Sequence, residues 1–133
     1  KLDVAHKAAL VGVGNLGSAM LAYPGFKTYG FEIAAAFDIN PNKVGKKIHN
    51  ITIENANKLN RLKDRNIDVG IIAVPLEAAQ QTADELVNAG VKGILNFSPT
   101  YIIVPKKVKI IAIDIAMYLA RLPYYMPHKL RAS

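Results

Sequence analysis

The chain has 133 residues, of which 51% are hydrophobic and 20% charged, and its formal net charge is +7. This length suits one globular core and is too short for two, and no apolar run approaches the roughly 18 residues that span a bilayer. The absence of cysteine excludes disulfides, thiolate metal ligands and cysteine nucleophiles, and favours a reducing compartment such as the cytoplasm.

The first third of the chain predicts the strand, turn and helix that open a βαβ unit. Residues 8–13 are a short apolar run that stops at glycine, as in a strand buried on both faces. Apolar residues then recur at steps of three and four over 16–23, which indicates a short helix. A second buried strand is expected at 33–37, Asn40-Pro41 is typical of a helix start, and the polar stretch 42–50 is expected to be a loop.

The rest of the chain continues to alternate between strand and helix patterns. In chain order, the pattern predicts a polar helix at 56–62, a strand at 69–74, a helix at 77–89, a strand at 93–97, two strands at 101–104 and 108–113, and a last helix at 114–122. This alternation indicates one α/β domain over residues 1–133, with a doubly wound, mostly parallel sheet.

A glycine-rich motif lies where the first predicted strand meets the first predicted helix. The segment Gly12-Val13-Gly14-Asn15-Leu16-Gly17 fits G-x-G-x-x-G. The first glycine permits a tight turn, the second lets a pyrophosphate approach the backbone, and the third lets the helix pack closely on the strand. Nine glycines can match such a pattern by chance, but its position between strand and helix predicts a Rossmann dinucleotide site.

An acidic residue completes this fingerprint at the end of the second predicted strand. Asp38 follows Gly17 by 21 residues, where a carboxylate accepts hydrogen bonds from the adenosine ribose. Such a carboxylate repels a 2′-phosphate and favours NAD over NADP, although Lys43, Lys46 and Lys47 could soften that preference. The alternative is that Asp38 is only a surface turn residue.

Two later strand ends are candidates for the nicotinamide side of the ligand. Val74 and Pro75 follow one strand, and Asn96, Phe97 and Ser98 close the next. Both ends are mostly apolar, so a pocket there would favour NADH, whose ring is uncharged, over NAD⁺. The alternative is that these residues only close their strands.

The sequence lacks a placed acid or base for hydride chemistry. The three histidines, His6, His49 and His128, lie in the lead-in, a polar loop and the tail of the chain. No carboxylate or histidine cluster has the spacing of a metal site. We therefore expect a binding domain and not an enzyme.

Positive charge is concentrated late in the chain. Residues 101–133 carry six basic groups and one acidic group. Such an excess favours polyanionic partners, including direct contact with DNA, but an ordinary solvated surface would show the same composition.

Several stretches, taken together, resemble the redox-sensing repressor family Rex. They are 11–17 (VGVGNLG), 35–38 (AAFD), 43–45 (KVG), 73–75 (AVP) with 78–80 (AAQ), and 93–97 (GILNF). The resemblance implies the family's CoA-binding-type Rossmann domain, which binds NADH or NAD⁺. It also implies a homodimer that releases operator DNA when NADH rises, and a winged-helix DNA-binding domain that is absent from this chain.

The resemblance also implies roles for particular residues. The loop from Gly12 to Gly17 would hold the pyrophosphate and Asp38 the ribose, with Ile39 and Lys43 beside it. The remaining expected cofactor contacts are Val74, Pro75, Asn96, Phe97, Ser98 and Asp114.

The last predicted helix, 114–122, would be exchanged between the subunits of a dimer, with Asp114 coupling cofactor binding to the DNA-binding domains. Its apolar face suits burial against a partner, but an ordinary core helix would have the same pattern. Two other functions stay open: the coenzyme-binding fragment of an NAD-dependent oxidoreductase, and a piece of a CoA ligase.

Overall fold

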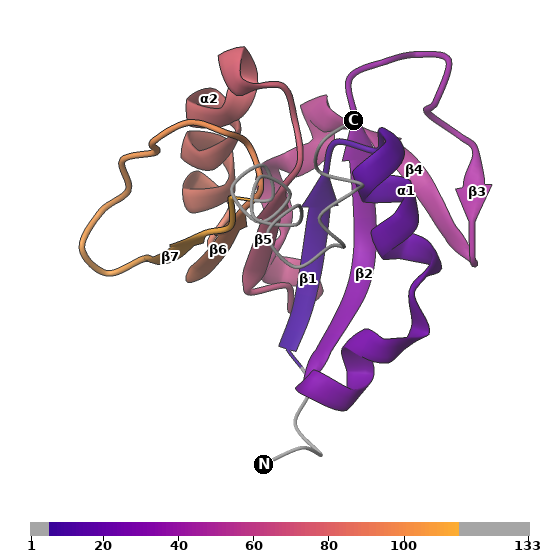
Figure 1. The fold of residues 1–133 in the computed structure, drawn as a ribbon, viewed down its shortest axis with the longest axis horizontal. Coiled ribbons are helices and arrows are strands. Elements are labelled where there is room, and N and C mark those ends of the chain that lie inside the picture. The colour runs from indigo at the N-terminus through magenta and orange to yellow at the C-terminus, as the bar shows by residue number, and fades with distance from the viewer. Residues whose placement is uncertain (1–5, 115–133) are drawn as a thin grey trace, which may run out of the picture.

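The computed structural model describes residues 6–114, which build one seven-stranded sheet with helices on both faces (Figure 1). The strands are β1 (His6–Val11), β2 (Phe31–Asp38), β3 (Lys47–Ile48), β4 (Ile51–Asn55), β5 (Val69–Ile72), β6 (Gly93–Asn96) and β7 (Lys109–Ala112). The helices are α1 (Asn15–Ala22) and α2 (Leu76–Asn88), with 3₁₀ segments at Pro24–Tyr29, Ala56–Arg61 and Lys63–Arg65. The predicted doubly wound, mostly parallel α/β fold is confirmed.

The strand order is β3-β4-β2-β1-β5-β6-β7, with β1 at the centre. Neighbouring strands are parallel except β3 and β4, which are antiparallel. The chain leaves β1 toward β2 and β4, and then returns to form β5, β6 and β7 on the other side of β1. This reversal creates a switch point at the carboxyl ends of β1 and β5, where doubly wound sheets bind their ligands.

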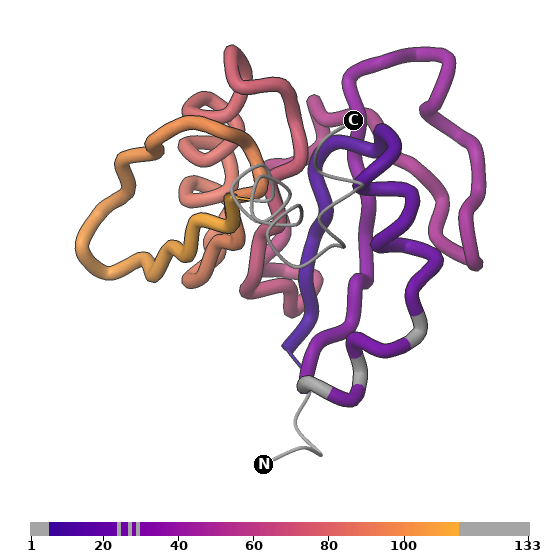
Figure 2. The backbone as a smooth tube through the Cα atoms, viewed as in Figure 1, coloured from indigo at the N-terminus to yellow at the C-terminus, as the bar shows by residue number. Residues whose placement is uncertain are grey.

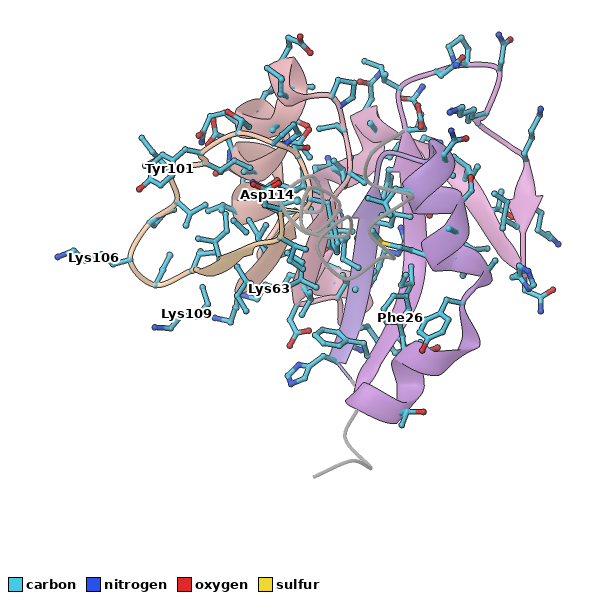
Figure 3. All side chains as sticks on the ribbon, viewed as in Figure 1. Phe26, Lys63, Tyr101, Lys106, Lys109 and Asp114 are labelled. Atoms are coloured by element: carbon cyan, nitrogen blue, oxygen red, sulfur yellow. The ribbon has the colours of Figure 1, made fainter. Side chains whose placement is uncertain are left out.

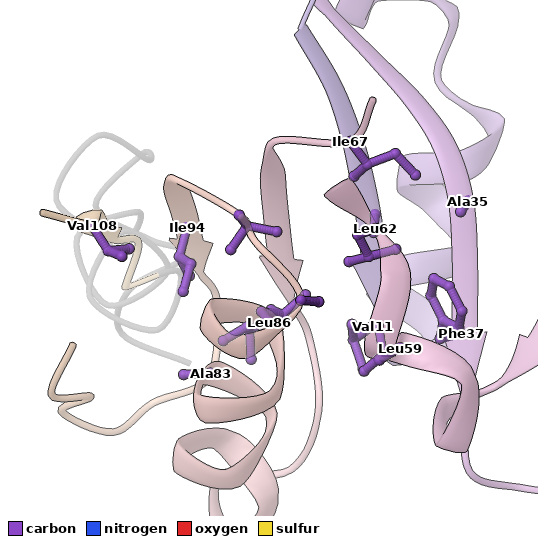
Figure 4. Packing of buried hydrophobic residues seen from close by; sticks show 14 of the residues in the cluster. Val11, Ala35, Phe37, Leu59, Leu62, Ile67, Ala83, Leu86, Ile94 and Val108 are labelled. Atoms are coloured by element: carbon purple, nitrogen blue, oxygen red, sulfur yellow. The ribbon is translucent and has the colours of Figure 1, made fainter. Parts of the chain in front are cut away.

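The core consists of two apolar layers, one on each face of the sheet. Ala9 and Val11 of β1 belong to the layer that contains α2, whereas Ala8 and Leu10 belong to the layer that contains α1. Figure 4 shows the α2 layer, in which Leu86 of the helix packs near the sheet. Because successive residues of a strand face opposite sides, a strand covered on both sides needs a continuous apolar run.

Most predicted elements are present with ends shifted by a few residues. The two helices predicted at 16–23 and 77–89 begin and end one residue earlier than expected. The strand predicted at 8–13 ends at Val11, because Gly12 adopts a φ of +102° and turns the chain. No helix among residues 6–114 has the length and apolar character needed to cross a membrane.

Predictions for the middle of the chain were partly wrong. Asn40-Pro41 begins a turn and not a helix, and the expected loop at 42–50 contains the short strand β3. The strand β4 was not predicted at all. The polar helix expected at 56–62 is a 3₁₀ segment, which is interrupted at Lys58 by a φ of −100° and a ψ of 19°.

The strand predicted at 101–104 does not form. Instead, residues 97–108 make a wide excursion past α2 before β7 begins (Figure 2). Gln80 of α2 explains this local structure, since its amide donates to the carbonyl of Ile103 and accepts from the Ile103 N–H, both at 2.9 Å. Backbone groups that bond to a side chain in this way are not available to a neighbouring strand. The last predicted helix, 114–122, lies outside the described residues apart from Asp114.

Candidate functional site

The glycine-rich loop joins β1 to α1, and each of its glycines meets a different environment. A Cβ atom at Gly12 would lie 2.5 Å from the carbonyl oxygen of Ala73, and one at Gly17 would collide with the carbonyl oxygen of Gly12. A Cβ atom at Gly14 would meet no protein atom within 4 Å. The outer glycines are therefore required by the protein itself, whereas Gly14 keeps an open approach to the backbone.

The helix α1 begins at this open position. Gly14 is its N-cap residue, no side chain caps it, and no acidic residue lies in its first turn. The first N–H groups of a helix have no partner within the helix, and they carry partial positive charge. Asn15 and Leu16 are exposed in this turn. The loop therefore offers N–H donors and the positive end of a helix to an anion.

Asp38 lies at the carboxyl end of β2 and supports the glycine-rich loop. Its Oδ2 accepts the N–H of Val13 at 2.8 Å, and its Oδ1 accepts the N–H of Asn40 at 2.8 Å. Each carboxylate oxygen can accept a second hydrogen bond. The side chain therefore fixes the loop and can still accept hydrogen bonds from the hydroxyls of a ligand.

Lys43 is bonded to the same loop from the other side of Val13. Its Nζ donates to the Val13 carbonyl oxygen at 2.8 Å. The N–H of Val13 is therefore bonded to Asp38 and its carbonyl oxygen to Lys43. The predicted cofactor residue Lys43 is thus placed as a support of the glycine-rich loop.

A cavity of about 190 Å³ opens at the carboxyl ends of β1, β2 and β5. The predicted residues Gly12, Asp38, Ile39, Val74 and Pro75 line it together. Sequence reasoning missed the others, which are Val11 at the end of β1 and six residues from α2 and the 3₁₀ segment after β4: Ala56, Asn57, Ala78, Gln81, Thr82 and Glu85.

The four missed residues from α2 share a signal that was available in the sequence. Their numbers, 78, 81, 82 and 85, have the spacing of one face of a helix. The apolar pattern of this helix comes instead from the neighbouring buried residues Ala79, Ala83 and Leu86, so it did not point to the face at the cavity. Asn57 gave no such signal, since β4 and the segment after it were not recognised.

Two of the residues predicted for the nicotinamide side are buried and serve the framework. Ser98 donates through Oγ to the carbonyl oxygen of Val74 at 2.5 Å, and its N–H bonds Oδ1 of Asn96 at 2.9 Å. The amide of Asn96 donates to the Thr100 carbonyl oxygen at 3.0 Å. The bond from Ser98 to Val74 joins the segments that follow β5 and β6, and the two bonds of Asn96 hold the turn after β6. Phe97 packs against the layer on the α1 face.

Asp114 is the first residue of the last predicted helix, and it is exposed just after β7. The preceding residue, Ile113, donates its N–H to the Asn96 carbonyl oxygen at 2.8 Å. Asp114 therefore lies at the same carboxyl edge of the sheet as the cavity.

The charges around the cavity determine how it can bind an anion. The described residues that line it include two carboxylates, Asp38 and Glu85, and no lysine or arginine. A hydroxyl-rich group in the cavity would suit Asp38, and a phosphate group would need the N–H groups at the start of α1, in the glycine-rich loop that continues from Gly12. The combination fits a ligand that has both a pyrophosphate and a ribose.

Comparison with known proteins gives a consistent family. The family model of the CoA binding domain matches residues 3–100. A redox-sensing transcriptional repressor Rex from Halalkalibacterium halodurans is 44% identical over 126 residues, which are 95% of this chain and 60% of that protein. The Rex of Carboxydothermus hydrogenoformans is 47% identical over 116 residues, which are 86% of this chain and 56% of that protein.

Solved structures agree with the sequence relatives. RSP, a Rex-family repressor, in complex with beta-NADH matches with a TM-score of 0.86 and 37% identity, over 93% of this chain and 60% of that one. RSP in complex with beta-NAD⁺ and operator DNA matches with a TM-score of 0.85. The chain spans about 60% of the length of the first of these relatives. The chain belongs to the CoA binding domain family, and its resemblance to Rex repressors is confirmed over most of its length.

Proposed function

We propose that this chain is the NADH- and NAD⁺-sensing part of a redox-responsive transcriptional repressor. The observation that carries the proposal is a glycine-rich loop next to a cavity. The loop has an open backbone at Gly14, where α1 begins, and its first glycine, Gly12, lines the cavity together with the carboxylate of Asp38. The complexes of RSP with beta-NADH, and with beta-NAD⁺ and operator DNA, support it.

In this proposal the glycine-rich loop and the neighbouring cavity bind different parts of the dinucleotide. The N–H groups from Gly14 to Gly17 bind the pyrophosphate, and Asp38 accepts hydrogen bonds from the adenosine ribose. Ile39 and the exposed face of α2 contact the adenosine. Val74 and Pro75 contact the nicotinamide, and the bond from Ser98 to Val74 keeps that wall in place.

The redox state of the ligand is distinguished on the nicotinamide side. The NAD⁺ ring carries a positive charge, and burying it beside Val74 and Pro75 costs free energy that the neutral NADH ring does not require. The two carboxylates of the cavity, Asp38 and Glu85, belong to the adenosine side in this arrangement. The site therefore favours NADH.

The signal reaches DNA through a change in a dimer. A ligand shifts an equilibrium only by its difference in affinity for the two states, so NADH must bind the DNA-free arrangement of two subunits better. Operator DNA is contacted by a winged-helix domain outside these 133 residues, in the cytoplasm. The segment 114–122, beginning at Asp114, links the subunits.

Coenzyme A and enzymatic turnover are the competing functions. Coenzyme A carries a phosphate on its ribose, which the carboxylate of Asp38 would repel. An oxidoreductase needs an acid or base near the hydride, and in the proposed arrangement the two carboxylates of the cavity, Asp38 and Glu85, lie on the adenosine side. Both observations favour a sensor.

Titration calorimetry with NADH, NAD⁺, NADPH and coenzyme A tests the proposal directly on the 133-residue chain. NADH should bind most tightly, NAD⁺ more weakly, and NADPH and coenzyme A least. Equal affinities for NADH and NAD⁺ would exclude a redox sensor. Tight binding of coenzyme A would favour the ligase alternative, and steady oxidation of NADH with a small substrate would favour the oxidoreductase.

A further inference from the structure

A second cavity lies at the amino edge of the sheet, opposite the nucleotide cavity. Its volume is about 400 Å³, compared with about 190 Å³ at the carboxyl edge. It is bounded by the end of α2, the start of β5 and the turn before β7. The residues that argue for a function are Lys63, Asn66, Asp68, Gly90, Lys92 and Lys107.

The three lysines of this cavity come from three segments that hydrogen bonds hold in place. Lys63 donates its N–H to the carbonyl of Ala89 at 3.0 Å, and Lys92 donates its N–H to the carbonyl of Asp68 at 2.8 Å. Lys107 lies in a turn closed by the bond from the N–H of Val108 to the Pro105 carbonyl at 2.9 Å. The positions from which the ammonium groups extend are therefore fixed by the fold.

Gly90 allows Lys63 to pack closely at this edge. It has a φ of +101°, and a Cβ atom there would lie 2.8 Å from the Cβ of Lys63. The stem of the lysine thus packs over the end of α2. Figure 3 shows Lys63 near the middle of the view, with Lys106 at the far left on the excursion before β7.

The balance of charge around the cavity is positive. The described lining has three lysines and one carboxylate, Asp68, whose Oδ2 lies 2.9 Å from Nδ1 of His6. The three lysines are exposed, so the mutual repulsion of their ammonium groups is weakened by solvent, and a bound anion would lower it further. The side-chain amide of Asn66 adds a further possible donor.

We propose that this cavity binds a small, multiply charged phosphate compound, at a site separate from the dinucleotide site. Its volume is within the range of small-molecule sites, and lysine is a common partner of phosphate. This inference does not depend on the proposed function, because none of its residues lines the cavity at the carboxyl edge.

Amide NMR spectra of the 133-residue chain, titrated with tripolyphosphate at constant ionic strength, locate the site. We expect saturable shifts at Lys63, Gly90, Lys92 and Lys107, including in the presence of NADH. Shifts confined to the loop from Gly12 to Gly17 would overturn the proposal, as would shifts that do not saturate. NADH binding is observed separately in the same spectra, so the two proposals can fail independently.

Matched pairs of substitutions separate a built site from diffuse attraction. The variant Lys92→Gln with Lys107→Gln should weaken tripolyphosphate binding by about tenfold or more, equivalent to roughly 1.4 kcal/mol. The control, Lys106→Gln with Lys109→Gln, removes the same charge from neighbouring positions outside the cavity and should change binding less than about twofold.

Equal losses in the two double variants would show general attraction and overturn the proposal. A short DNA duplex that binds with this lysine dependence, while tripolyphosphate does not bind, would identify a nucleic-acid surface instead and also overturn it. Thermal unfolding confirms that each variant is folded.

Discussion

The two edges of the sheet present positive charge in different ways. At the carboxyl edge, the cavity lining has carboxylates and no lysine, and the positive character comes from backbone N–H groups at the start of α1. At the amino edge, three lysines surround a larger cavity near the end of α2. Backbone N–H donors are held in place by the fold, so they select a ligand by its shape. Lysine side chains are flexible, so they select a ligand mainly by its charge.

The comparison predicts that the carboxyl edge is intolerant of small changes in the backbone. Gly12→Ala should abolish measurable NADH binding and lower the free energy of unfolding by about 1–3 kcal/mol, because a positive φ and the contact with Ala73 both oppose a side chain. Calorimetry and thermal unfolding measure the two effects.

Gly14→Ala is the matched variant for Gly12→Ala. Its Cβ atom would meet no protein atom, so stability should be unchanged while NADH affinity falls, because the methyl group takes space that the pyrophosphate needs. Unchanged NADH affinity in this variant would show that the open side of the loop is not where the ligand lies.

A substitution at Asp38 tests how much the carboxylate charge, and not only the shape of the backbone, contributes to ligand binding at the carboxyl edge. Asp38→Asn should weaken NADH binding by about tenfold to a hundredfold, since hydrogen bonds to a charged group contribute roughly 1.5–3 kcal/mol. The preference for NADH over NADPH should also narrow, because the repulsion of the 2′-phosphate is lost. If the preference stays the same in parallel titrations with the two ligands, another residue sets it.

Lys43 tests whether a lysine at the carboxyl edge acts on the ligand or on the loop. Lys43→Met removes the bond to the Val13 carbonyl and should destabilise the chain by about 1 kcal/mol. NADH and NADPH affinities should fall by a similar factor, because both ligands use the same loop. Lys46→Met, at an exposed neighbouring position, is the control. A selective loss of NADPH affinity would show instead that Lys43 contacts the 2′-phosphate.

The smallest effect is expected when the amino edge is changed and the carboxyl edge is measured. Lys92→Gln with Lys107→Gln should alter NADH affinity by less than about twofold, since neither side chain lines that cavity. A larger change, measured by calorimetry at two salt concentrations, would indicate that α2 couples the two edges.

The elements of the fold were predicted well where one physical signal dominated. β1, β2, β5 and β6 appear in the sequence as apolar runs, because parallel strands covered on both faces need them. β3 and β4 lie near the edge of the sheet, where this requirement is weaker, and their mixed composition hid them. The stretch 101–104 has the apolar composition of a strand. However, the amide of Gln80 forms hydrogen bonds with the N–H and the carbonyl of Ile103, which a neighbouring strand would need.

The residues of the candidate site also fall into those that local sequence signals predicted and those whose contacts depend on the fold. The glycine spacing and Asp38 were evident from the sequence, since a tight turn, a helix start and an acid at the next strand end are local requirements. Asn96 and Ser98 stay predicted as ligand contacts, and the fold adds a second role, since both are buried and bonded to the turn after β6 or to Val74. This second role could not be predicted, because polar residues at a strand end have the same pattern whether they meet a ligand or another loop.

The sequence by itself determined the α/β class, the dinucleotide fingerprint and the resemblance to Rex repressors, because these depend on spacing along the chain. Only the tertiary structure decided which residues of α2 face the cavity, that Asp38 and Lys43 bond the two sides of Val13, and that three lysines far apart in sequence share one cavity. These facts depend on strand order and on contacts between segments that are distant in sequence, and local sequence patterns carry no information about either.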